Sequence, residues 1–310
     1  MFKVHCDKCK SGNIIKNGHN GIKQRYQCKE CKHRFIYKRN HISKVDIYKE
    51  FVIDEMKLEQ LAKKYNKSVR TISNYIKEVR ESDFQFDLPT DMEIILEVDA
   101  TYFNKKDGIL LACDHITGKV VYIKRIISES KKEFQEMLIE LKNRNIKIKG
   151  CVSDGIKALR ELLSGVSHQY CQVHATRRVE QLIGKKPKDK AAKSLLSIAR
   201  KITKCGSDYF KKLLDKWYHK YHNLLEEEEL NLETLKLMIK YKELRDAYNF
   251  LVNNFELFFT FEKCEGLPKD NNRMEGIFSQ FKTGFKIHRG ISPKTREKYS
   301  LIYFNKFNVI

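Results

Sequence analysis

The sequence predicts an α/β protein in which two small N-terminal modules precede a larger domain of strands and helices. Two C-x-x-C pairs lie within the first forty residues, and apolar residues then recur with helical spacing from 44 to 82. Runs rich in β-branched residues alternate with amphipathic stretches from 91 to 173. We therefore expect the modules at residues 1–42, 43–83 and 91–310, with a linker at residues 84–90.

The composition is strongly basic. The 310 residues contain 61 Lys and Arg against 40 Asp and Glu, which gives a net charge of +21. Such a surplus is typical of a protein with a polyanionic partner, and charge alone fits either a nucleic acid or an anionic membrane. No run of about 18 apolar residues is present, so we expect no transmembrane helix and no membrane partner. The first residues lack the apolar core of a signal peptide, so we expect a cytoplasmic protein.

The first module is predicted to hold one structural zinc ion. Its two cysteine pairs, separated by 18 residues, are Cys6 with Cys9 and Cys28 with Cys31. Four thiolates complete a tetrahedral sphere and leave no open position. An iron–sulfur or redox cysteine set is the alternative. A segment this small cannot build its own core, so metal binding would supply its folding free energy.

Basic side chains interleave with aromatic residues around these cysteines. Arg25 and Arg34 are candidates for contacts with DNA phosphates.

The second module is predicted to be a helix-turn-helix. Val69, Ile72, Ile76 and Val79 mark the buried face of its last helix, and Ser68 is a natural N-cap. The opposite face carries side chains of the types that read DNA grooves: Arg70, Thr71, Ser73, Asn74 and Lys77. A three-helix bundle with a polar face is the alternative, but the basic first module favours DNA binding.

The third module contains an aspartate inside an apolar strand. Asp99 lies in the run 93–103, where a carboxylate is costly to bury unless it is paired or binds a metal. The solvent face of the strand is the commoner explanation for a single case. Two further acids in similar positions, Asp154 and Glu275, favour a site instead. Asp114 is a rival acid, but its place in a hairpin turn explains it without catalysis.

The order of elements from 91 to 173 is that of a ribonuclease-H-like fold. Strands are expected at 93–103, 109–114, 119–127, 146–152 and 168–173, with helices at 131–143 and 156–163. In that fold the first and fourth strands are neighbours, so Asp99 and Asp154 would meet at one edge of the site. From about 175 to 265 the sequence is charged and helical in pattern, including the acidic run 226–229, and we expect an α-helical insertion.

Four motifs occur in a fixed order: E-V-D-A-T at 97–101, V-S-D-G at 152–155, C-Q-V-H at 171–174 and N-N-R-M-E-G-I-F-S-Q-F-K at 271–282. Together they resemble the DDE transposases of bacterial and archaeal insertion sequences. The mutator-like branch fits best, because it has an α-helical insert between the second Asp and the Glu. The cysteine-rich N-terminus likewise resembles the zinc ribbons of such transposases.

The resemblance implies that Asp99, Asp154 and Glu275 are the catalytic residues. They would hold two Mg²⁺ (or Mn²⁺) ions, with Asp99 bridging both. Cleavage of a phosphodiester by water and strand transfer by a 3′-hydroxyl both need an activated nucleophile and a stabilised leaving oxygen, which two such ions supply.

Three further residues are assigned from their positions around the motifs. The resemblance implies that Lys282 holds DNA near the cut. Arg177 is a candidate phosphate contact, and His174 is a candidate supporting residue near the metals. Half of a second zinc site is the alternative for the C-x-x-H motif.

We therefore expect a transposase that binds the terminal inverted repeats of its element and catalyses strand cleavage and transfer. Its partners would be double-stranded DNA of the element ends and target and further copies of itself, in a homodimer or larger assembly. The alternatives are a transposase-derived DNA-binding regulator and a ribonuclease-H-like structure-specific nuclease. Retention of the three acids and Lys282 argues against the first, and the two N-terminal modules argue against the second.

Overall fold

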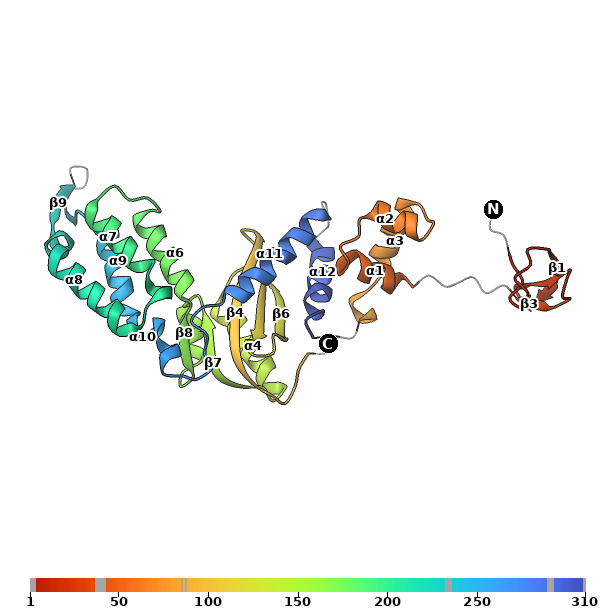
Figure 1. Ribbon diagram of the computed structural model, residues 1–310, viewed down its shortest axis with the longest axis horizontal. Helices are drawn as coiled ribbons and strands as arrows, with labels where there is room; N and C mark the ends of the chain where they lie inside the picture. Colours follow the sequence, from red (N-terminus) through yellow and green to blue (C-terminus); the bar gives the residue numbers. More distant parts are fainter. Residues whose placement is uncertain are drawn as a thin grey trace. The chain divides into compact units, whose positions relative to one another are not determined.

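A computed structural model describes residues 4–36, 43–84, 86, 88–231, 236–288 and 293–308 of the chain. Two residues of the expected linker, Gln85 and Asp87, lie outside them. The chain divides into two compact units: Met1–Phe51 with Leu58–Val79, and Val52–Lys57 with Arg80–Ile310. Figure 1 labels the helices and strands of both.

The N-terminal segment of the smaller unit is a three-stranded antiparallel sheet. Its strands are β1 (Ile14–Asn20), β2 (Lys23–Cys28) and β3 (Arg34–Ile36), in the order β1-β2-β3. The buried apolar cluster is small, consisting of Cys6, Cys28 and Phe35 with a few half-buried neighbours. So little buried surface cannot offset the entropy of ordering the segment without a further stabilising link.

Three short helices follow in the chain: α1 (Lys44–Val52), α2 (Leu58–Lys64) and α3 (Val69–Glu78). The Ser68 cap is confirmed, because its hydroxyl accepts a hydrogen bond from the Thr71 N–H at 3.1 Å. Ile72 and Ile76 of α3 are buried, which leaves the opposite face of this helix in solvent.

The larger unit is built on a mixed five-stranded sheet with the order β6-β5-β4-β7-β8 (Figure 1). Its strands are β4 (Glu93–Asn104), β5 (Asp107–Asp114), β6 (Val120–Ile126), β7 (Lys147–Ser153) and β8 (Ser167–Tyr170). The pairs β4–β5 and β5–β6 are antiparallel, whereas β4–β7 and β7–β8 are parallel. The predicted adjacency of the first and fourth strands is therefore observed.

The two faces of β4 have different roles because successive side chains of a strand point to opposite faces. Ile94, Leu96 and Val98 pack into a core with α4 (Lys131–Asn143) and α5 (Lys157–Leu162). The alternate residues face α11 (Asn272–Ile287), against which Phe103 packs with a ring distance of 4.8 Å to Phe285. Asp99 belongs to this second set.

Helix α12 (Pro293–Asn305) packs against both α11 and β6. The Phe281 ring of α11 lies 5.1 Å from Tyr303 and 4.7 Å from Phe304, and all three side chains are buried. A contact of this kind between large buried rings fixes a helix firmly against its neighbour.

The insertion has its own core. It contains α6 (Gln172–Ile183), α7 (Lys190–Ala199), α8 (Ser207–Glu226), α9 (Lys242–Asn253) and α10 (Phe255–Phe258). The chain also forms short 3-10 turns at Glu81–Asp83, Ile202–Lys204 and Thr260–Glu262. Trp217 is buried at the centre of the insertion and donates a hydrogen bond to the Ala191 carbonyl at 3.0 Å.

Two expectations about this region are wrong. The acidic run is helical only at Glu226, the last residue of α8, because Glu228–Asn231 forms strand β9, which pairs antiparallel with β10 (Lys236–Ile239). Carboxylates are unfavourable at the negative end of a helix, and Glu227 instead pairs with Lys240 across the ribbon.

The strand expected at 168–173 also ends early. It stops at Tyr170, and Cys171 is the N-cap of α6. The Cys171 N–H still bonds to the Ser153 carbonyl at 2.8 Å, but the Gln172 N–H bonds to Lys269 at 3.1 Å and so leaves the sheet.

Across the ranges given above, no helix combines the length and the apolar character needed to cross a membrane.

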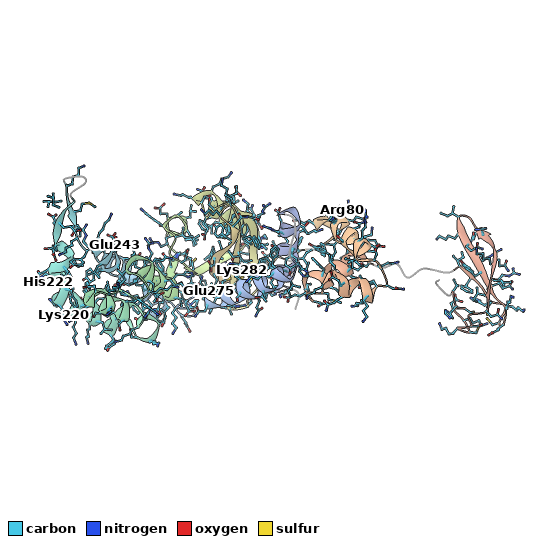
Figure 2. The ribbon with its side chains drawn as sticks, turned by 90° about the horizontal axis from the view of Figure 1, so that it is seen from above. Arg80, Lys220, His222, Glu243, Glu275 and Lys282 are labelled. Carbon is cyan, nitrogen blue, oxygen red and sulfur yellow. The ribbon has the colours of Figure 1, made fainter. Side chains whose placement is uncertain are left out.

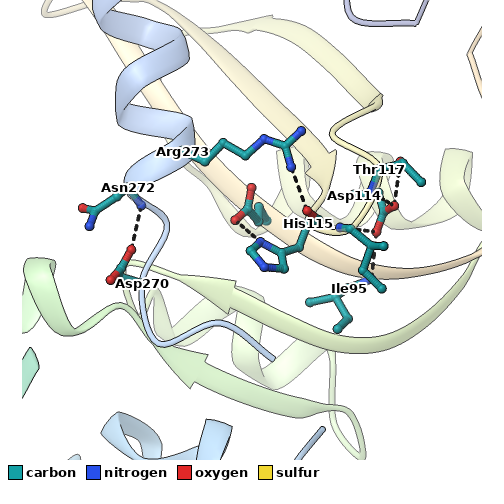
Figure 3. Close-up of polar contacts among 9 residues, drawn as sticks. Ile95, Asp114, His115, Thr117, Asp270, Asn272 and Arg273 are labelled. Carbon is teal, nitrogen blue, oxygen red and sulfur yellow. Dashed lines mark hydrogen bonds and ion pairs between the residues drawn. The ribbon is translucent and has the colours of Figure 1, made fainter. Parts of the chain in front are cut away.

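The turn after β5 is held by Asp114, which is 1% exposed. Its carboxylate accepts hydrogen bonds from the N–H groups of Ile95 at 3.2 Å and Thr117 at 2.9 Å, and from the Thr117 hydroxyl at 2.7 Å (Figure 3). These bonds confirm the structural interpretation of this acid.

Replacing Asp114 with alanine removes the acceptor of three N–H groups, those of Ile95, Ile116 and Thr117, of which only the Ile95 bond is buried. We expect Asp114→Ala to lower the free energy of unfolding of the larger unit by about 1–3 kcal/mol, the usual cost of one orphaned buried donor. Calorimetric melting measures the loss. Asp215→Ala, which removes an exposed carboxylate from α8, is the matched control, and equal melting of the two variants would contradict the assignment.

Candidate functional site

The four predicted zinc ligands come together in the smaller unit. Their sulfur atoms all lie within 4.8 Å of one another, and Cys6–Cys31 and Cys9–Cys28 are each separated by 3.5 Å. Tetrahedral zinc with bonds of about 2.3 Å requires sulfur separations of about 3.8 Å, so the donor set fits this ion. The backbone N–H of Cys31 lowers the pKa of Cys28 to about 7, which favours the thiolate that a metal binds.

The two cysteine pairs lie on turns of the same design. The Lys10 N–H donates to the Cys6 carbonyl at 2.9 Å, and the Lys32 N–H donates to the Cys28 carbonyl at 3.0 Å. Both lysines have a left-handed backbone, with φ of 61° and 60°. This conformation costs about 1–2 kcal/mol outside glycine, so a stronger interaction must hold both turns, and a shared metal would provide it.

In the larger unit, two of the predicted catalytic acids come from neighbouring strands. Glu97 of β4 is the partner of Val152 in the parallel β7. Asp99 lies two residues further along β4, and Asp154 lies one residue past the end of β7 at Ser153. Glu275 comes from the first turn of α11, the helix that faces the same side of β4.

These acids share one negative electrostatic environment. Burial raises the pKa of Asp99 to about 7, and the charges of Asp154, Glu129 and Glu275 add to this rise, while the Ala100 N–H opposes it. Burial also raises the pKa of Asp154, against the opposing charge of His174. Uncompensated carboxylates in a partly buried site are the donors that Mg²⁺ and Mn²⁺ prefer, so the residues fit such ions.

The carboxylates do not form a closed cage. Within the described ranges, only the four cysteines bring three or more ligand atoms within 4.8 Å of one another. Glu275 is instead engaged by Arg177 of α6, whose two terminal nitrogens each contact one carboxylate oxygen, with the Nη2–Oε2 distance at 2.8 Å. His174 lies one helical turn before Arg177, with its Nε2 at 3.8 Å from Glu275 Oε1.

Arg177 was predicted to contact phosphate, and the structure gives it a carboxylate partner. The forked pairing is the strongest geometry available to an arginine. It raises the pKa of Arg177 further and neutralises one of the three acids.

A fourth acid, Glu129, belongs to the same environment and was missed in the sequence. It stands between β6 and α4, just before the Ser130 cap of that helix. Burial and the charge of Asp154 raise the pKa of Glu129 to about 7, and its carboxylate accepts a hydrogen bond from Tyr102 at 3.4 Å. No local signal distinguishes it from a solvated loop acid.

A polar link that was also missed fixes the start of α11 (Figure 3). Glu97 is fully buried and lies 2.8 Å from His115 Nδ1. Arg273 donates a hydrogen bond to the His115 carbonyl at 2.7 Å, two residues before Glu275. Burial raises the pKa of Glu97, and the bond with His115 opposes the rise. The link therefore ties the helix of Glu275 to the strand of Asp99.

The predicted DNA-contacting residues differ in exposure. On α3, Arg70, Asn74 and Lys77 are exposed, whereas Thr71 and Ser73 are half-buried. The Thr71 hydroxyl is already bonded to the Ser68 hydroxyl at 2.8 Å.

In the segment that carries the four clustered cysteines, Arg34 is exposed, while Arg25 is half-buried and donates to the Asn17 carbonyl at 3.0 Å. Lys282 is exposed on α11, two helical turns beyond Glu275 (Figure 2).

A comparison with protein families supports a Mutator-like transposase. The family described as transposase, Mutator family, matches residues 119–249 of the chain. This stretch is less than half of the 310 residues and runs from β6 into α9, so it contains Asp154, His174 and Arg177 but neither Asp99 nor Glu275. A comparison with curated proteins finds no match.

Removing one cysteine tests the metal site. We expect Cys28→Ser to reduce bound zinc from about one ion per chain to none, and to unfold the segment of β1 to β3, because metal binding supplies its folding free energy. Atomic absorption measures the zinc, and proteolysis measures the unfolding. Cys264→Ser, outside the cluster, should keep the ion. Stoichiometric zinc in the Cys28 variant would refute the assignment.

The raised pKa of Asp99 makes the stability of the larger unit depend on pH. The unfolded chain releases this proton near the ordinary value of 3.8 and the folded protein near 7, so stability is fully present at low pH and falls as the pH rises between the two. In magnesium-free buffer we expect Asp99→Asn to melt above the wild type at about pH 8, with the two converging toward pH 4.

Fluorimetric melting across this range measures the difference. Asp215→Asn, on an exposed position of α8, should follow the wild type at every pH. A wild type that is as stable as the Asp99 variant at the higher pH would contradict the burial of this charge.

Proposed function

We propose that the protein is a DDE transposase that binds the terminal inverted repeats of its element and catalyses DNA strand cleavage and transfer. What supports the proposal most is that Asp99 of β4 and Asp154, just past the end of the parallel β7, come from neighbouring strands, with Glu275 in the same electrostatic environment. The strand order β6-β5-β4-β7-β8 supports a ribonuclease-H-like catalytic fold. The Mutator-family match over 119–249 supports the same class of reaction.

In this proposal Asp99, Asp154 and Glu275 hold two divalent ions, with Mg²⁺ or Mn²⁺ fitting the oxygen donors. When bound, such ions activate the attacking hydroxyl and stabilise the leaving oxygen of the phosphodiester. Glu129 adds negative charge beside Asp154 and strengthens the attraction for cations. His174 lies close to both Asp154 and Glu275 and limits their repulsion.

Arg177 has two roles in this scheme. In the absence of DNA it neutralises Glu275. When a strand enters, a phosphate would take the place of the carboxylate on the guanidinium, and the released Glu275 carboxylate would be available to hold a divalent ion. Lys282, exposed two turns further along α11, would hold the same strand.

Recognition of the element ends would come from the smaller unit. Arg70, Asn74 and Lys77 form an exposed stripe on α3, suited to the major groove, while the zinc-binding segment adds phosphate contacts through Arg34. Two ends must be joined in one reaction, so we propose a homodimer or larger assembly on DNA.

One observation favours a second candidate, a DNA-binding regulator derived from a transposase. The ion pair of Arg177 with Glu275 neutralises a residue that the reaction requires. A regulator would keep this pair permanently, whereas an enzyme would open it.

Cleavage of labelled DNA that carries the flanking sequence of the gene tests the proposal. We expect a Mg²⁺-dependent cut at the repeat boundary, and we expect Asp154→Asn and Glu275→Gln to slow it at least about 10²–10³-fold, the usual cost of losing one electrostatic contributor to catalysis. Asp208→Asn, on an exposed position of α8, should cut at the wild-type rate.

Other outcomes separate the alternatives. Binding without cutting by any of the proteins would assign the regulator. Cutting restricted to branched DNA would assign a structure-specific nuclease. Undiminished cutting by both acid variants would remove Asp154 and Glu275 from the mechanism.

A further inference from the structure

A basic depression of about 480 Å³ lies on the helical insertion, apart from the acids of the candidate active site. It is bounded by the α6–α7 loop, α7 and the turn at Ile202–Lys204, and α6 and α7 lie side by side (Figure 1). Six of its nine lining residues are cations and none is an acid. The six are Lys185, Lys186, Lys193, Arg200, Lys201 and Lys204.

Most of this charge has no counter-charge in the described residues. Arg200 pairs with Glu180, with Nη2–Oε1 at 2.7 Å, but the five lysines form no ion pair there. Other lysines of the insertion do pair, such as Lys240 with Glu227 and Lys263 with Glu256. Like charges repel one another, so a cluster of unneutralised cations is unfavourable for the protein alone. Such a cluster is typical of a surface that binds a polyanion.

Two further depressions continue the first one toward α11. Lys204 also lines a depression of about 340 Å³, which it shares with Lys269. Lys269 in turn lines a third, of about 290 Å³, together with Arg273. Because neighbouring depressions share a lining residue, they lie in a row from α7 to Arg273 in the first turn of α11. We call this row the basic path.

The acids along the basic path are already bonded within the protein. Glu262 accepts hydrogen bonds from the Ser207 N–H at 3.0 Å and hydroxyl at 2.6 Å. Asp270 accepts from the Asn272 N–H at 3.2 Å, and the buried Glu97 is bonded to His115. Along the whole path eight Lys and Arg residues face three acids, and the excess of cations is greatest in the first depression.

We propose that the basic path binds the phosphate backbone of duplex DNA without reading its sequence. Mobile lysine tips suit phosphates, which follow one another every 3.4 Å of axis along each strand. The cations come from a loop, one face of α7 and a turn, so no helix is presented to a groove, and the contacts position DNA rather than identify it. The inference rests on DNA as the partner in the proposed function, but it does not require catalysis.

The salt dependence of binding by the full-length protein tests the proposal. The variant is Lys186→Ala, Lys193→Ala and Lys201→Ala combined, and the probe is a mixed-sequence duplex without inverted repeats, in magnesium-free buffer. Three lost phosphate contacts should reduce the slope of log affinity against log salt by about 2.7, since each contributes about 0.9. When the salt concentration rises from about 50 to 200 mM, both proteins lose affinity. The fold loss should be about 40 times smaller for the variant than for the wild type.

The matched control removes the same charge from the same insertion. Lys212→Ala, Lys216→Ala and Lys220→Ala combined lie on exposed positions of α8, outside the basic path, and should leave the slope near that of the wild type. Circular dichroism establishes that both variants keep their helices.

Two outcomes would overturn the proposal. An unchanged slope in the first variant would do so, and so would equal changes in both variants, because net charge alone would then explain them. If DNA binding were unchanged while binding to vesicles containing phosphatidylserine fell, the path would belong to a lipid surface instead. Since the probe is never cut, these results stand whether or not the protein proves to be a transposase.

Discussion

Repulsion among partly buried carboxylates is the constraint around which the larger unit is arranged. Asp99 comes from β4 and Asp154 from just past the end of the neighbouring β7, and Glu275 and Glu129 add charge from a helix and a loop. Desolvation makes each charge costlier, so a fold that gathers them must supply cations. Helix α6 supplies such a cation, because its Arg177 forms an ion pair with Glu275.

The surrounding structure holds these mutually repelling carboxylates in place. The core beneath β4 is apolar, with Leu96 and Val98 packed against α4, and therefore holds the strand without help from the acids. On the other face, the link from Glu97 through His115 to Arg273 sets the start of α11, and the rings around Phe281 set its far end. The helix that carries Glu275 is thus fixed at both ends. The smaller unit follows a different principle, because its first segment has almost no apolar core and depends on four sulfur atoms.

Local signals in the sequence were sufficient for the regular elements. The apolar run of β4 and the Ser68 cap both depend on neighbours within a few residues, and both were predicted. The paired cysteine spacing predicted the sulfur cluster for the same reason. The adjacency of β4 and β7 was predicted from the order of the strands.

The features that were missed depend on partners far away in the chain. Arg177 meets Glu275 across 98 residues, and Arg273 meets His115 across 158 residues. The residues next to Arg177 and Arg273 in the sequence do not indicate that either arginine has a partner. Glu129 acquires its raised pKa from burial and from Asp154, so it reads as an ordinary loop residue until the sheet is assembled. The acidic run near 226 was assigned to a helix because charge composition does not reveal where a helix ends.

The residues of the candidate site are synthesised in the order in which they stand along the chain. A ribosome makes Asp99 and Asp154 first, then Arg177, and Glu275 only 121 residues after Asp154. At about 5–20 residues per second, the first two acids wait roughly 6–24 seconds for the last one. The guanidinium is made early in that interval and influences Asp99 as well as Glu275. A nascent chain therefore carries the cation that pairs with Glu275 before it carries Glu275 itself.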